Sequence, residues 1–469
     1  MEQKDKKNKR NVTVFWPAIP REENVIPAVK KLLWPPNGER PFVGEGEFVE
    51  QFEYECAKKF GFDYVLFTNS GTGGLDIALL SAGVKAGDEV ITTPMTCTVT
   101  NTVIVMRQAV PVFADVQYDT ANIDPKDIEH RITEKTKAIM VVHWSGYPCE
   151  MDEINKIAKK HSLEVIADGA HALGASYKGK PISQAADYTM FSLQSIKQMT
   201  TIDGGLLAIS MKKSRKDLIQ YSQILKNRNV LRKIFGKRLN DYFDQNIAVF
   251  EPPKDYFAKQ IFSDIKENKE LNPDFVSALT RNYHDFESFW LDWQKAESAR
   301  RRRWFGISKE ERVPSPEKGY SPYPTFESGG KYHGNNLGAL IGLAALKDYD
   351  NWDQRRKEIV ATYNDALKNV KGIKLFKHKS DRTSGNWLYN IHVERRDQFV
   401  PAMISRGVET SVVHERNDIL PIFRKYAKRS EGTMPNLEKL SGDRICLPLH
   451  QNMSDEDVKY VIEAIEQGW

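Results

Sequence analysis

Between residues 64 and 210 the chain alternates short apolar runs with stretches of helical periodicity, and few folds accommodate this alternation. The apolar runs are YVLFTN, GDEVITTP, VPVFADV, KAIMVVHW, LEVIADG, DYTMFSL and GLLAIS. Between them, TGGLDIALLSA has apolar residues at helical spacing, and residues 151–161 form a second predicted helix. Strands that alternate with helices predict a largely parallel sheet with helices on both faces. Ligands of such sheets bind at the carboxyl ends of the strands.

The pattern along the whole chain predicts five regions. Residues 1–20 are expected to form an N-terminal tail and residues 21–211 a large domain. Residues 212–300, rich in Lys, Asp, Asn, Phe and Trp, are expected to be a helical, exposed insertion. Residues 301–349 would return the chain to the large domain. Residues 350–469 combine helices with the strand-like WLYNIHV, which predicts a smaller α+β C-terminal domain.

The composition excludes several classes of protein. Apolar residues make up 40% and charged residues 28% of the 469 residues, as in ordinary soluble globular proteins. The four cysteines form no C-x-x-C pair, so we expect neither a disulfide framework nor a metal site. The first ten residues, MEQKDKKNKR, lack the apolar stretch of a secretory signal, and no run of about 18 apolar residues could span a membrane. We therefore expect a cytoplasmic protein, with a polybasic N-terminal anchor as the less favoured alternative.

A glycine-rich motif, NSGTGG at 69–74, lies between the first predicted strand and the first predicted helix. Gly71 would let the backbone approach a ligand closely. Free N–H groups of the first helical turn, together with the Thr72 hydroxyl, could then hold a phosphate. The alternative is a tight strand-to-helix turn with Thr72 as the helix cap.

Asp168 follows the apolar run VIA and should therefore lie at the carboxyl end of a strand. A carboxylate in that position is costly unless it meets a cation or hydrogen-bond donors. A protonated pyridine nitrogen is such a partner, and the pairing would let the ring accept electrons. The alternatives are a cap or turn role for Asp168 and a packed or surface position for His171, three residues later.

Lys197 lies between the predicted strand DYTMFSL and the pair Gly204-Gly205. A Schiff base requires an amine that can lose its proton and that is held over the site. A surface lysine in a loop is the alternative. A phosphate-type turn, a strand-end aspartate and a lysine 29 residues later (197 − 168), all on one sheet, together favour the Schiff-base role.

The chain resembles the DegT/DnrJ/EryC1/StrS family of sugar aminotransferases, which are pyridoxal 5′-phosphate (PLP) enzymes of fold type I. The resemblance covers about 42–211 and about 302–469. Its landmarks include FVGEGEFVEQFEYECAKKFG, NSGTGGLDIALLSAGVKAGDEVITTP, DGAHALGA, SLQSIKQMTTIDGG, GGKYHGNNLGALIGLAAL and ICLPLHQNMSDEDVKYVIEAI. The resemblance implies an α/β architecture with a mostly parallel seven-stranded sheet, a PLP-binding large domain and a smaller α+β C-terminal domain.

The resemblance also implies roles for individual residues. Lys197 matches the lysine that holds PLP as a Schiff base and then moves a proton as general base and acid. Asp168 matches the aspartate that pairs with the pyridine nitrogen. Gly71, Thr72 and Ser192 match positions that bind the cofactor phosphate.

Several positions depart from the pattern of the family. His171 stands where many members have Gln beside the phenolic oxygen of the cofactor, and a histidine can still donate to that oxygen. Cys97 stands where many members place an aromatic ring over the cofactor, so a softer sulfur contact would replace stacking. Lys331 and His333 stand where many members have an Asn that reaches the phosphate of the neighbouring subunit and a nearby substrate contact. Lys331 could serve that phosphate by its charge, whereas His333 would have lost the substrate contact.

The activity implied by the resemblance is transamination in one site that alternates PLP and pyridoxamine phosphate. The donor would be glutamate or glutamine, and the acceptor a nucleotide-linked keto sugar or a related cyclic ketone. The enzyme would be a homodimer with shared active sites and would bind neither nucleic acid nor membrane. A PLP-dependent sugar dehydratase is an alternative, but those relatives have His in place of the lysine, and Lys197 is present.

Two further interpretations of the sequence do not involve an enzyme. The run from Arg300 to Arg303 and the basic pI could mark a nucleic-acid-binding face. The run lacks the interleaved basic and aromatic positions of such a face, and is more simply a solvated helix face or a site for the diphosphate of a sugar nucleotide. A catalytically inactive scaffold is the second interpretation, and the intact set of Lys197, Asp168 and Thr72 argues against it.

Overall fold

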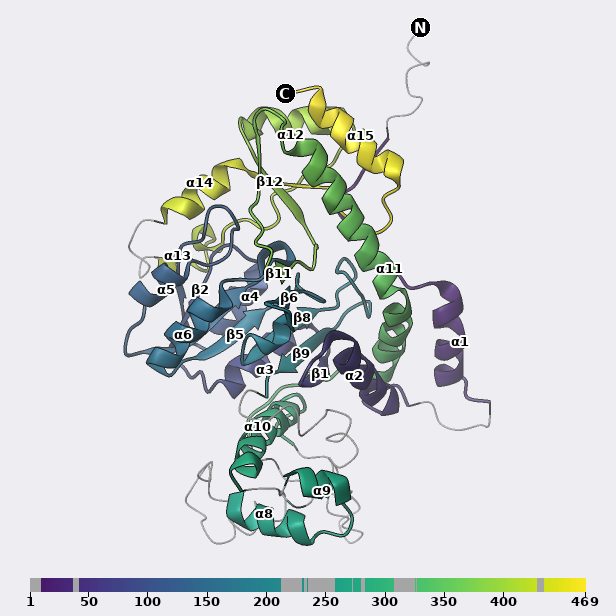
Figure 1. The fold of residues 1–469 in the computed structure, drawn as a ribbon, viewed down its shortest axis with the longest axis vertical. Coiled ribbons are helices and arrows are strands. Elements are labelled where there is room, and N and C mark those ends of the chain that lie inside the picture. The colour runs from purple at the N-terminus through teal and green to yellow at the C-terminus, as the bar shows by residue number, and fades with distance from the viewer. Residues whose placement is uncertain are drawn as a thin grey trace.

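The computed structural model places a sheet-containing region at the centre of the molecule, between two lobes (Figure 1). One lobe holds the C-terminal elements, and the other holds α8 (Ala258–Glu267), α9 (Pro273–Leu279) and α10 (Tyr283–Arg302). The structure describes residues 10–36, 42–211, 230–231, 234, 258–271, 273–279, 283–307, 325, 327–427 and 434–469. No helix within these ranges is long and apolar enough to cross a bilayer.

The central sheet has seven strands in the order β1-β9-β8-β5-β4-β2-β3. Their bounds are β1 (Tyr64–Thr68), β2 (Glu89–Thr92), β3 (Val110–Phe113), β4 (Thr136–Val142), β5 (Glu164–Asp168), β8 (Tyr188–Ser192) and β9 (Gly205–Ile209). The five strands from β8 to β3 pair in parallel, and β9 runs antiparallel to both of its neighbours. The predicted, largely parallel sheet is therefore confirmed, and each strand arises from one of the apolar runs.

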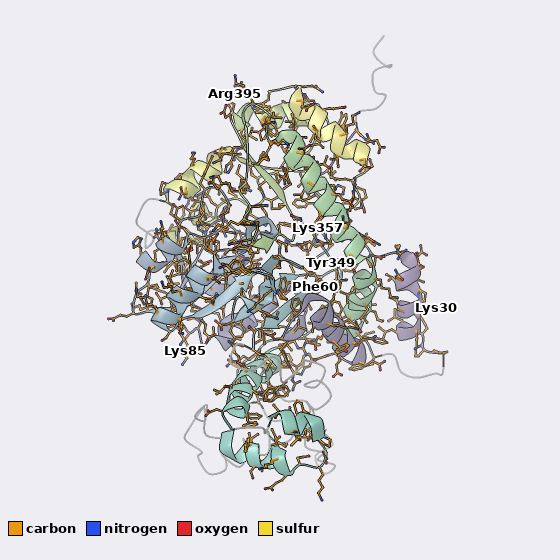
Figure 2. The ribbon with its side chains drawn as sticks, viewed as in Figure 1. Lys30, Phe60, Lys85, Tyr349, Lys357 and Arg395 are labelled. Carbon is orange, nitrogen blue, oxygen red and sulfur yellow. The ribbon has the colours of Figure 1, made fainter. Side chains whose placement is uncertain are left out.

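Helices cover both faces of the sheet, which explains why its strands are apolar on both sides. One face carries α3 (Gly71–Ser81), α4 (Thr98–Met106) and, packed on α3, α10. The other carries α2 (Glu47–Phe60), α5 (Pro125–His130), α6 (Met151–His161) and the first half of α11 (Asn336–Leu367). Figure 2 labels Phe60 and Tyr349 at the contact of α2 with α11, where the ring centroids lie 5.0 Å apart.

The sequence of α6 shows why these helices form and which face they bury. Met151, Ile154, Ile157 and Ala158 recur at helical spacing and are buried. Acidic residues occupy the first turn and basic residues the last, as the helix dipole favours. The helix therefore lies with its apolar stripe on the sheet and its charged face outward.

The insertion is helical in its described part, but one prediction about it was wrong. Residues 212–229 and 235–257 lie outside the described residues. The apolar side chains of α10 are buried rather than exposed: Phe286, Phe289, Trp290 and Trp293 extend the core that α3 contributes. These four positions follow i, i+3, i+4, i+7 spacing, so they form one helix face, and this face explains the aromatic composition.

The C-terminal lobe is α+β, as predicted. Its sheet has the order β10 (Ile373–Leu375), β12 (Tyr389–Val393), β13 (Arg444–Leu447). Around it lie α12 (Arg396–Ser405), α14 (Pro435–Asp443) and α15 (Asp455–Glu466), whereas α13 (Arg424–Ala427) packs against β3 of the central sheet. A second small sheet joins β11 (Arg382–Thr383) to β6 (Ser176–Tyr177) and β7 (Lys180–Pro181), and so ties this lobe to the central region.

The N-terminal segment does not behave as the tail that composition suggested. Val12 forms a bridge with Val408, and Val12, Val14 and Ala18 are buried. The chain then enters α1 (Glu22–Leu33), which packs against α11. The correction applies from residue 12 onward, since residues 1–9 lie outside the described part of the chain.

Candidate active site

The predicted site residues converge on one edge of the central sheet, where the parallel strands end. Asp168 ends β5 and Ser192 ends β8, and β1 leads directly into the NSGTGG turn. Because β9 is antiparallel, the chain must return along this edge from Ser192 to Gly205, and the connecting loop carries Lys197. The arrangement agrees with the general position of ligands in α/β sheets.

The first turn of α3 has unused backbone donors. Ser70 caps the helix, and not Thr72 as in the alternative interpretation of this motif: the Ser70 Oγ accepts from the Gly73 N–H at 3.1 Å. The Gly74 N–H donates to the Ser70 carbonyl at 3.2 Å. Within the described ranges, no acceptor takes the N–H groups of Gly71 and Thr72. Two donors at a helix N-terminus are the arrangement that holds a phosphate.

Two glycines allow this turn to lie against the ends of β8 and β9. A Cβ on Gly71 would come within 2.8 Å of the Met190 Sδ and 3.5 Å of the Ser192 Cβ. A Cβ on Gly205 would lie 2.8 Å from the Gly71 backbone nitrogen. Side chains at these positions would fill the space, so the glycines bring the Ser192 hydroxyl beside the helix N-terminus.

Asp168 is 5% exposed and held by neutral donors. The Thr100 hydroxyl donates to its Oδ2 at 2.7 Å and the Ala170 N–H to its Oδ1 at 3.0 Å. Burial raises the pKa of Asp168, against the effect of these donors and of the Lys197 charge. No basic side chain among the described residues forms an ion pair with it. The carboxylate therefore has unused acceptor capacity for a cationic ring nitrogen.

Lys197 has an amine that is easily neutralised. Burial lowers the pKa of Lys197 to about 8, although Asp168 and Cys97 act in the opposite direction. Its Nζ lies 3.4 Å from the centroid of the Trp387 ring. About a tenth of such amines are uncharged at pH 7, far more than for an ordinary lysine. The side chain can thus act as a nucleophile at neutral pH.

His171 is buried in a group of rings beside Lys197. Its imidazole stacks on Trp387, with centroids 3.9 Å apart, and lies edge-on to Trp144 at 5.8 Å. His414 lies parallel to it at 5.9 Å. Burial, assisted by Lys197 and His414, lowers the pKa of His171 well below its usual range. Its Nδ1 has no hydrogen-bond partner among the described residues, so a neutral imidazole is available to a ligand oxygen.

The backbones of two further predicted residues, Cys97 and Lys331, are each held by a hydrogen bond from an asparagine side chain. Cys97 is half-buried just before α4, and its carbonyl accepts from the Asn417 amide at 3.3 Å. Lys331 is exposed, and its carbonyl accepts from the Asn69 amide at 3.0 Å. The backbone of Lys331 therefore lies beside the NSGTGG turn, and its cofactor role stays a prediction.

The arginine run is not a solvated face, and this interpretation was wrong. Arg300, Arg301 and Arg303 are buried. The carboxylate partners are Glu297 for Arg300, Glu327 for Arg301 and Arg302, and Glu45 and Glu53 for Arg303. These guanidinium groups are already neutralised within the chain.

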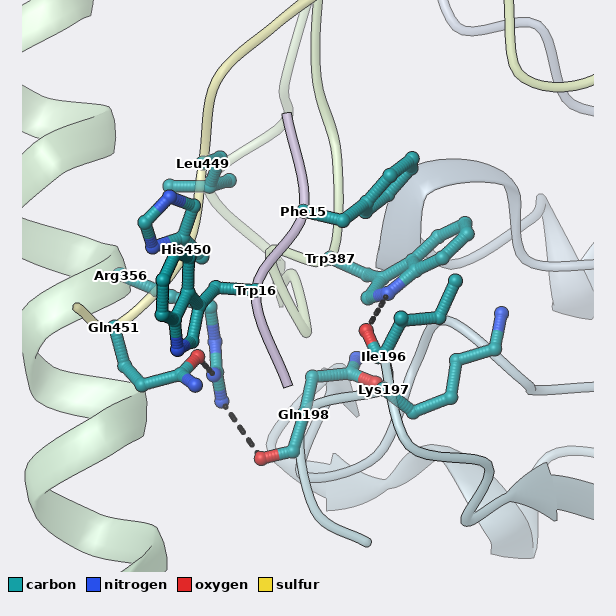
Figure 3. Close-up of a pocket in the computed structure, with 10 residues that line it drawn as sticks. All are labelled: Phe15, Trp16, Ile196, Lys197, Gln198, Arg356, Trp387, Leu449, His450 and Gln451. Atoms are coloured by element: carbon teal, nitrogen blue, oxygen red, sulfur yellow. Dashed lines mark hydrogen bonds between the residues drawn. The ribbon is translucent and has the colours of Figure 1, made fainter. Parts of the chain in front are cut away.

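A small pocket lies on the other side of the lysine loop, and of its lining residues only Lys197 was predicted from the sequence (Figure 3). The N-terminal segment contributes Phe15 and Trp16, and Trp387 donates its indole N–H to the Ile196 carbonyl at 2.9 Å. In Figure 3 the Lys197 side chain points away from Arg356. Residues from the N-terminal segment and the C-terminal lobe thus pack against the loop that carries Lys197. No local sequence motif predicts these contacts.

The arrangement fits PLP on three observations. The donors of Gly71 and Thr72 and the Ser192 hydroxyl suit its phosphate, Asp168 suits its pyridine nitrogen, and Lys197 suits its aldehyde. The phosphate, ring and aldehyde sites follow one another along a single sheet edge.

Comparison with known proteins agrees with this geometry. The model of the DegT/DnrJ/EryC1/StrS aminotransferase family matches residues 38–240 and 291–466. The chain belongs to this family. It is accordingly a PLP-dependent aminotransferase, and its cofactor is PLP. Between these two matched segments, residues 241–290 are unmatched, and they fall within the insertion.

Individual relatives span nearly the whole chain. An uncharacterized protein from Methanocaldococcus jannaschii is 30% identical over 97% of this chain and 96% of its own. The spore coat polysaccharide biosynthesis protein SpsC of Bacillus subtilis is 28% identical over 91% of each chain. The GDP-perosamine synthase of Escherichia coli O157:H7 is 26% identical over 90% of each. The sugar aminotransferase CalS13 from Micromonospora echinospora shares the fold, with a TM-score of 0.74 at 24% identity, covering 98% of this chain and 100% of its own.

Proposed function

We propose that this aminotransferase moves an amino group from glutamate or glutamine to a nucleotide-linked keto sugar or a related cyclic ketone. The observation that carries the proposal is the environment of Lys197. Its amine has a pKa of about 8 and lies at the same sheet edge as the buried Asp168 carboxylate. Amino transfer through PLP requires an amine that can bind the aldehyde and a carboxylate that can pair with the ring nitrogen, and Lys197 and Asp168 supply these two groups.

Each residue has a role in the proposed reaction. When bound, PLP supplies an electron sink that stabilises a carbanion next to the transferred nitrogen. Lys197 would hold the cofactor and would act as general base and acid for the proton that moves during amino transfer. Asp168, oriented by Thr100, would keep the ring nitrogen protonated. His171, as a neutral imidazole, would donate a hydrogen bond to the phenolic oxygen.

The acceptor class is supported by the relatives. SpsC is named for spore coat polysaccharide biosynthesis, and another relative is a GDP-perosamine synthase. We propose that this chain also aminates a sugar destined for a polysaccharide, in the cytoplasm and as a homodimer with shared sites. In that dimer the family resemblance gives Lys331 a role at the cofactor phosphate of the partner subunit, and an alternative role for its ammonium is proposed below. The proposed domain bounds remain 21–211, 301–349 and 350–469, with residues 212–300 as the insertion.

A PLP-dependent sugar dehydratase is the second candidate, because it would use the same cofactor on a sugar substrate. The presence of Lys197 speaks against it. Such enzymes have His in place of this lysine, and a His side chain cannot form a Schiff base with the cofactor. This chain retains the lysine.

The test is the visible absorption spectrum of the purified protein after incubation with PLP. We expect a band from lysine-bound cofactor in the wild type, its bleaching by glutamate or glutamine, and its absence in Lys197→Ala. Adding a 2-keto acid should restore the band. If the wild-type band is absent, or if neither donor bleaches it, the proposed transamination is wrong.

A further inference from the structure

Four side chains form a cluster at the end of α10: Trp304, Phe305, Lys331 and His333, called here the Trp304 cluster. Of these, Lys331 alone has a role in the proposed function, at a cofactor phosphate. The His333 ring meets the Trp304 ring edge-on, with centroids 4.1 Å apart. The Phe305 ring lies at 5.0 Å from the Trp304 ring. The Lys331 Nζ lies 5.9 Å from the Trp304 ring centroid, and the backbones of Trp304 and Lys331 form a bridge. Two aromatic rings and a cation thus share one surface.

Phe305 has an unusual conformation within this cluster. Its φ is +56°, a left-handed value that bulky residues rarely adopt. Its N–H donates to the Gly330 carbonyl at 3.0 Å, which fixes the strained backbone. The side chain is nevertheless 43% exposed, so this strain is not offset by burial of the ring. Strained residues of this kind concentrate at binding sites.

The Trp304 cluster lies beside the turn that holds the cofactor phosphate. The Asn69 N–H donates to the Tyr332 carbonyl at 2.7 Å, and the Asn69 amide donates to the Lys331 carbonyl at 3.0 Å. The Tyr332 hydroxyl donates to Asp76 of α3 at 2.6 Å. His333 forms a bridge with Thr68, the last residue of β1. These bonds fix the cluster at the sheet edge where the site opens.

The charge at this surface is positive and comes from one side chain. The neighbouring arginines are paired with glutamates, as described above. Across the described ranges, no carboxylate forms an ion pair with Lys331. An exposed ring next to an unneutralised ammonium suits a flat base that carries phosphate groups.

We propose that the Trp304 cluster binds the nucleoside diphosphate part of the acceptor, with the base stacked on Phe305 and a phosphate held by Lys331. This inference rests on the proposed function, in which the acceptor is nucleotide-linked. Trp304 supports both contacting groups. His333 orients Trp304 by its edge-on contact.

The test is calorimetric titration of the PLP-loaded enzyme with UDP, GDP and dTDP, and with the matching nucleosides. We expect at least one diphosphate to bind and its nucleoside to bind more weakly. Phe305→Asn removes the ring, while asparagine tolerates the left-handed backbone. It should lower diphosphate affinity about tenfold, as expected for one lost base stack, and leave the melting temperature unchanged or higher. If Phe305 had only a structural role, its replacement would lower the melting temperature together with the diphosphate affinity.

Lys331→Met distinguishes the two phosphates that its ammonium could hold. Weaker diphosphate binding with unchanged nucleoside and PLP binding supports the proposal. Weaker PLP binding with unchanged diphosphate binding would assign Lys331 to the cofactor phosphate and overturn its role here. Trp34→Asn and Lys30→Met, on and after α1, are matched exposed controls and should leave nucleotide affinity unchanged.

Two results would overturn the inference as a whole. One is the absence of binding by all three diphosphates up to about 1 mM. The other is an affinity of Phe305→Asn equal to that of the wild type. Either result leaves the proposed function standing if glutamate or glutamine still bleaches the wild-type absorption band, so the two proposals fail separately.

Discussion

Burial lowers the pKa of Lys197 to about 8, and an aldehyde reacts only with the neutral amine. Below pH 8 the lysine is mostly protonated, so the rate of PLP capture by the apoprotein should rise about tenfold per pH unit. Above pH 8 the rate should become constant. Stopped-flow absorption between pH 6 and 10 would measure this profile. A rate that still rises towards pH 10 would show an ordinary lysine, with a pKa of about 10.4.

Individual site residues differed in how far sequence could reveal them. Asp168 and Lys197 follow strands whose apolar runs are plain in the sequence, so their place at the sheet edge could be predicted. Trp387 and His414, which lie against His171, come from more than 200 residues further along the chain. No local pattern brings such residues together, because their contact depends on how the C-terminal lobe packs. Ser70 rather than Thr72 caps α3 because its side chain reaches the Gly73 N–H.

At the scale of elements, the approach of α3 to β9 depends on Gly205. A Cβ there would lie 2.8 Å from three backbone atoms, Ser70 C, Ser70 O and Gly71 N, none of which can rotate away. Gly205→Ala should therefore displace the phosphate turn and weaken PLP affinity at least about tenfold, which equals ~1.4 kcal/mol. PLP titration of the apoprotein by absorption would measure the loss. Unchanged PLP affinity would mean that the turn does not bind the phosphate.

Gly442 offers the matched control for this substitution. It lies in α14, and a Cβ there would meet nothing within 4 Å. Gly442→Ala should leave PLP affinity unchanged and increase stability by about 0.5–1 kcal/mol, because alanine favours the helix. Comparing the two variants separates a steric effect at the turn from a general effect of replacing glycine.

The helices also show where composition misleads. The many charged residues of the insertion suggested an exposed element, yet Trp290 and Trp293 of α10 are fully buried. The spacing of its aromatic residues carried the correct signal, because it confines them to one face. The packing partner, α3, could not be predicted, since 201 residues (82–282) separate the two helices in the sequence.

At the scale of the whole molecule, the site depends on contacts between distant parts of the chain. The Ala18 N–H donates to the Ser195 carbonyl at 3.2 Å, two residues before Lys197. The Phe15 ring stacks on Trp387, with centroids 5.3 Å apart, and Trp387 in turn contacts Lys197 and His171. The N-terminal segment and the C-terminal lobe thus hold the lysine loop between them. The first ten residues are charged, and the apolar stretch VTVFWPA that follows them contains no local pattern that indicates which loop it contacts.

This dependence predicts that removing residues 1–18 damages both stability and cofactor binding. The deletion removes buried Val12 and Val14, each worth about 1.5–3 kcal/mol, and the stack on Trp387. Denaturant unfolding should show the lost stability, and a weaker absorption band should show poorer binding of PLP by Lys197. Removing only residues 1–9 retains every contact named here and is the control. The point variant Phe15→Ala should reproduce the spectral change with a smaller loss of stability, whereas Ile19→Ala, at a 65% exposed position, should not. If residues 1–18 can be removed without a change in the absorption band, the lysine loop is held by the C-terminal lobe alone.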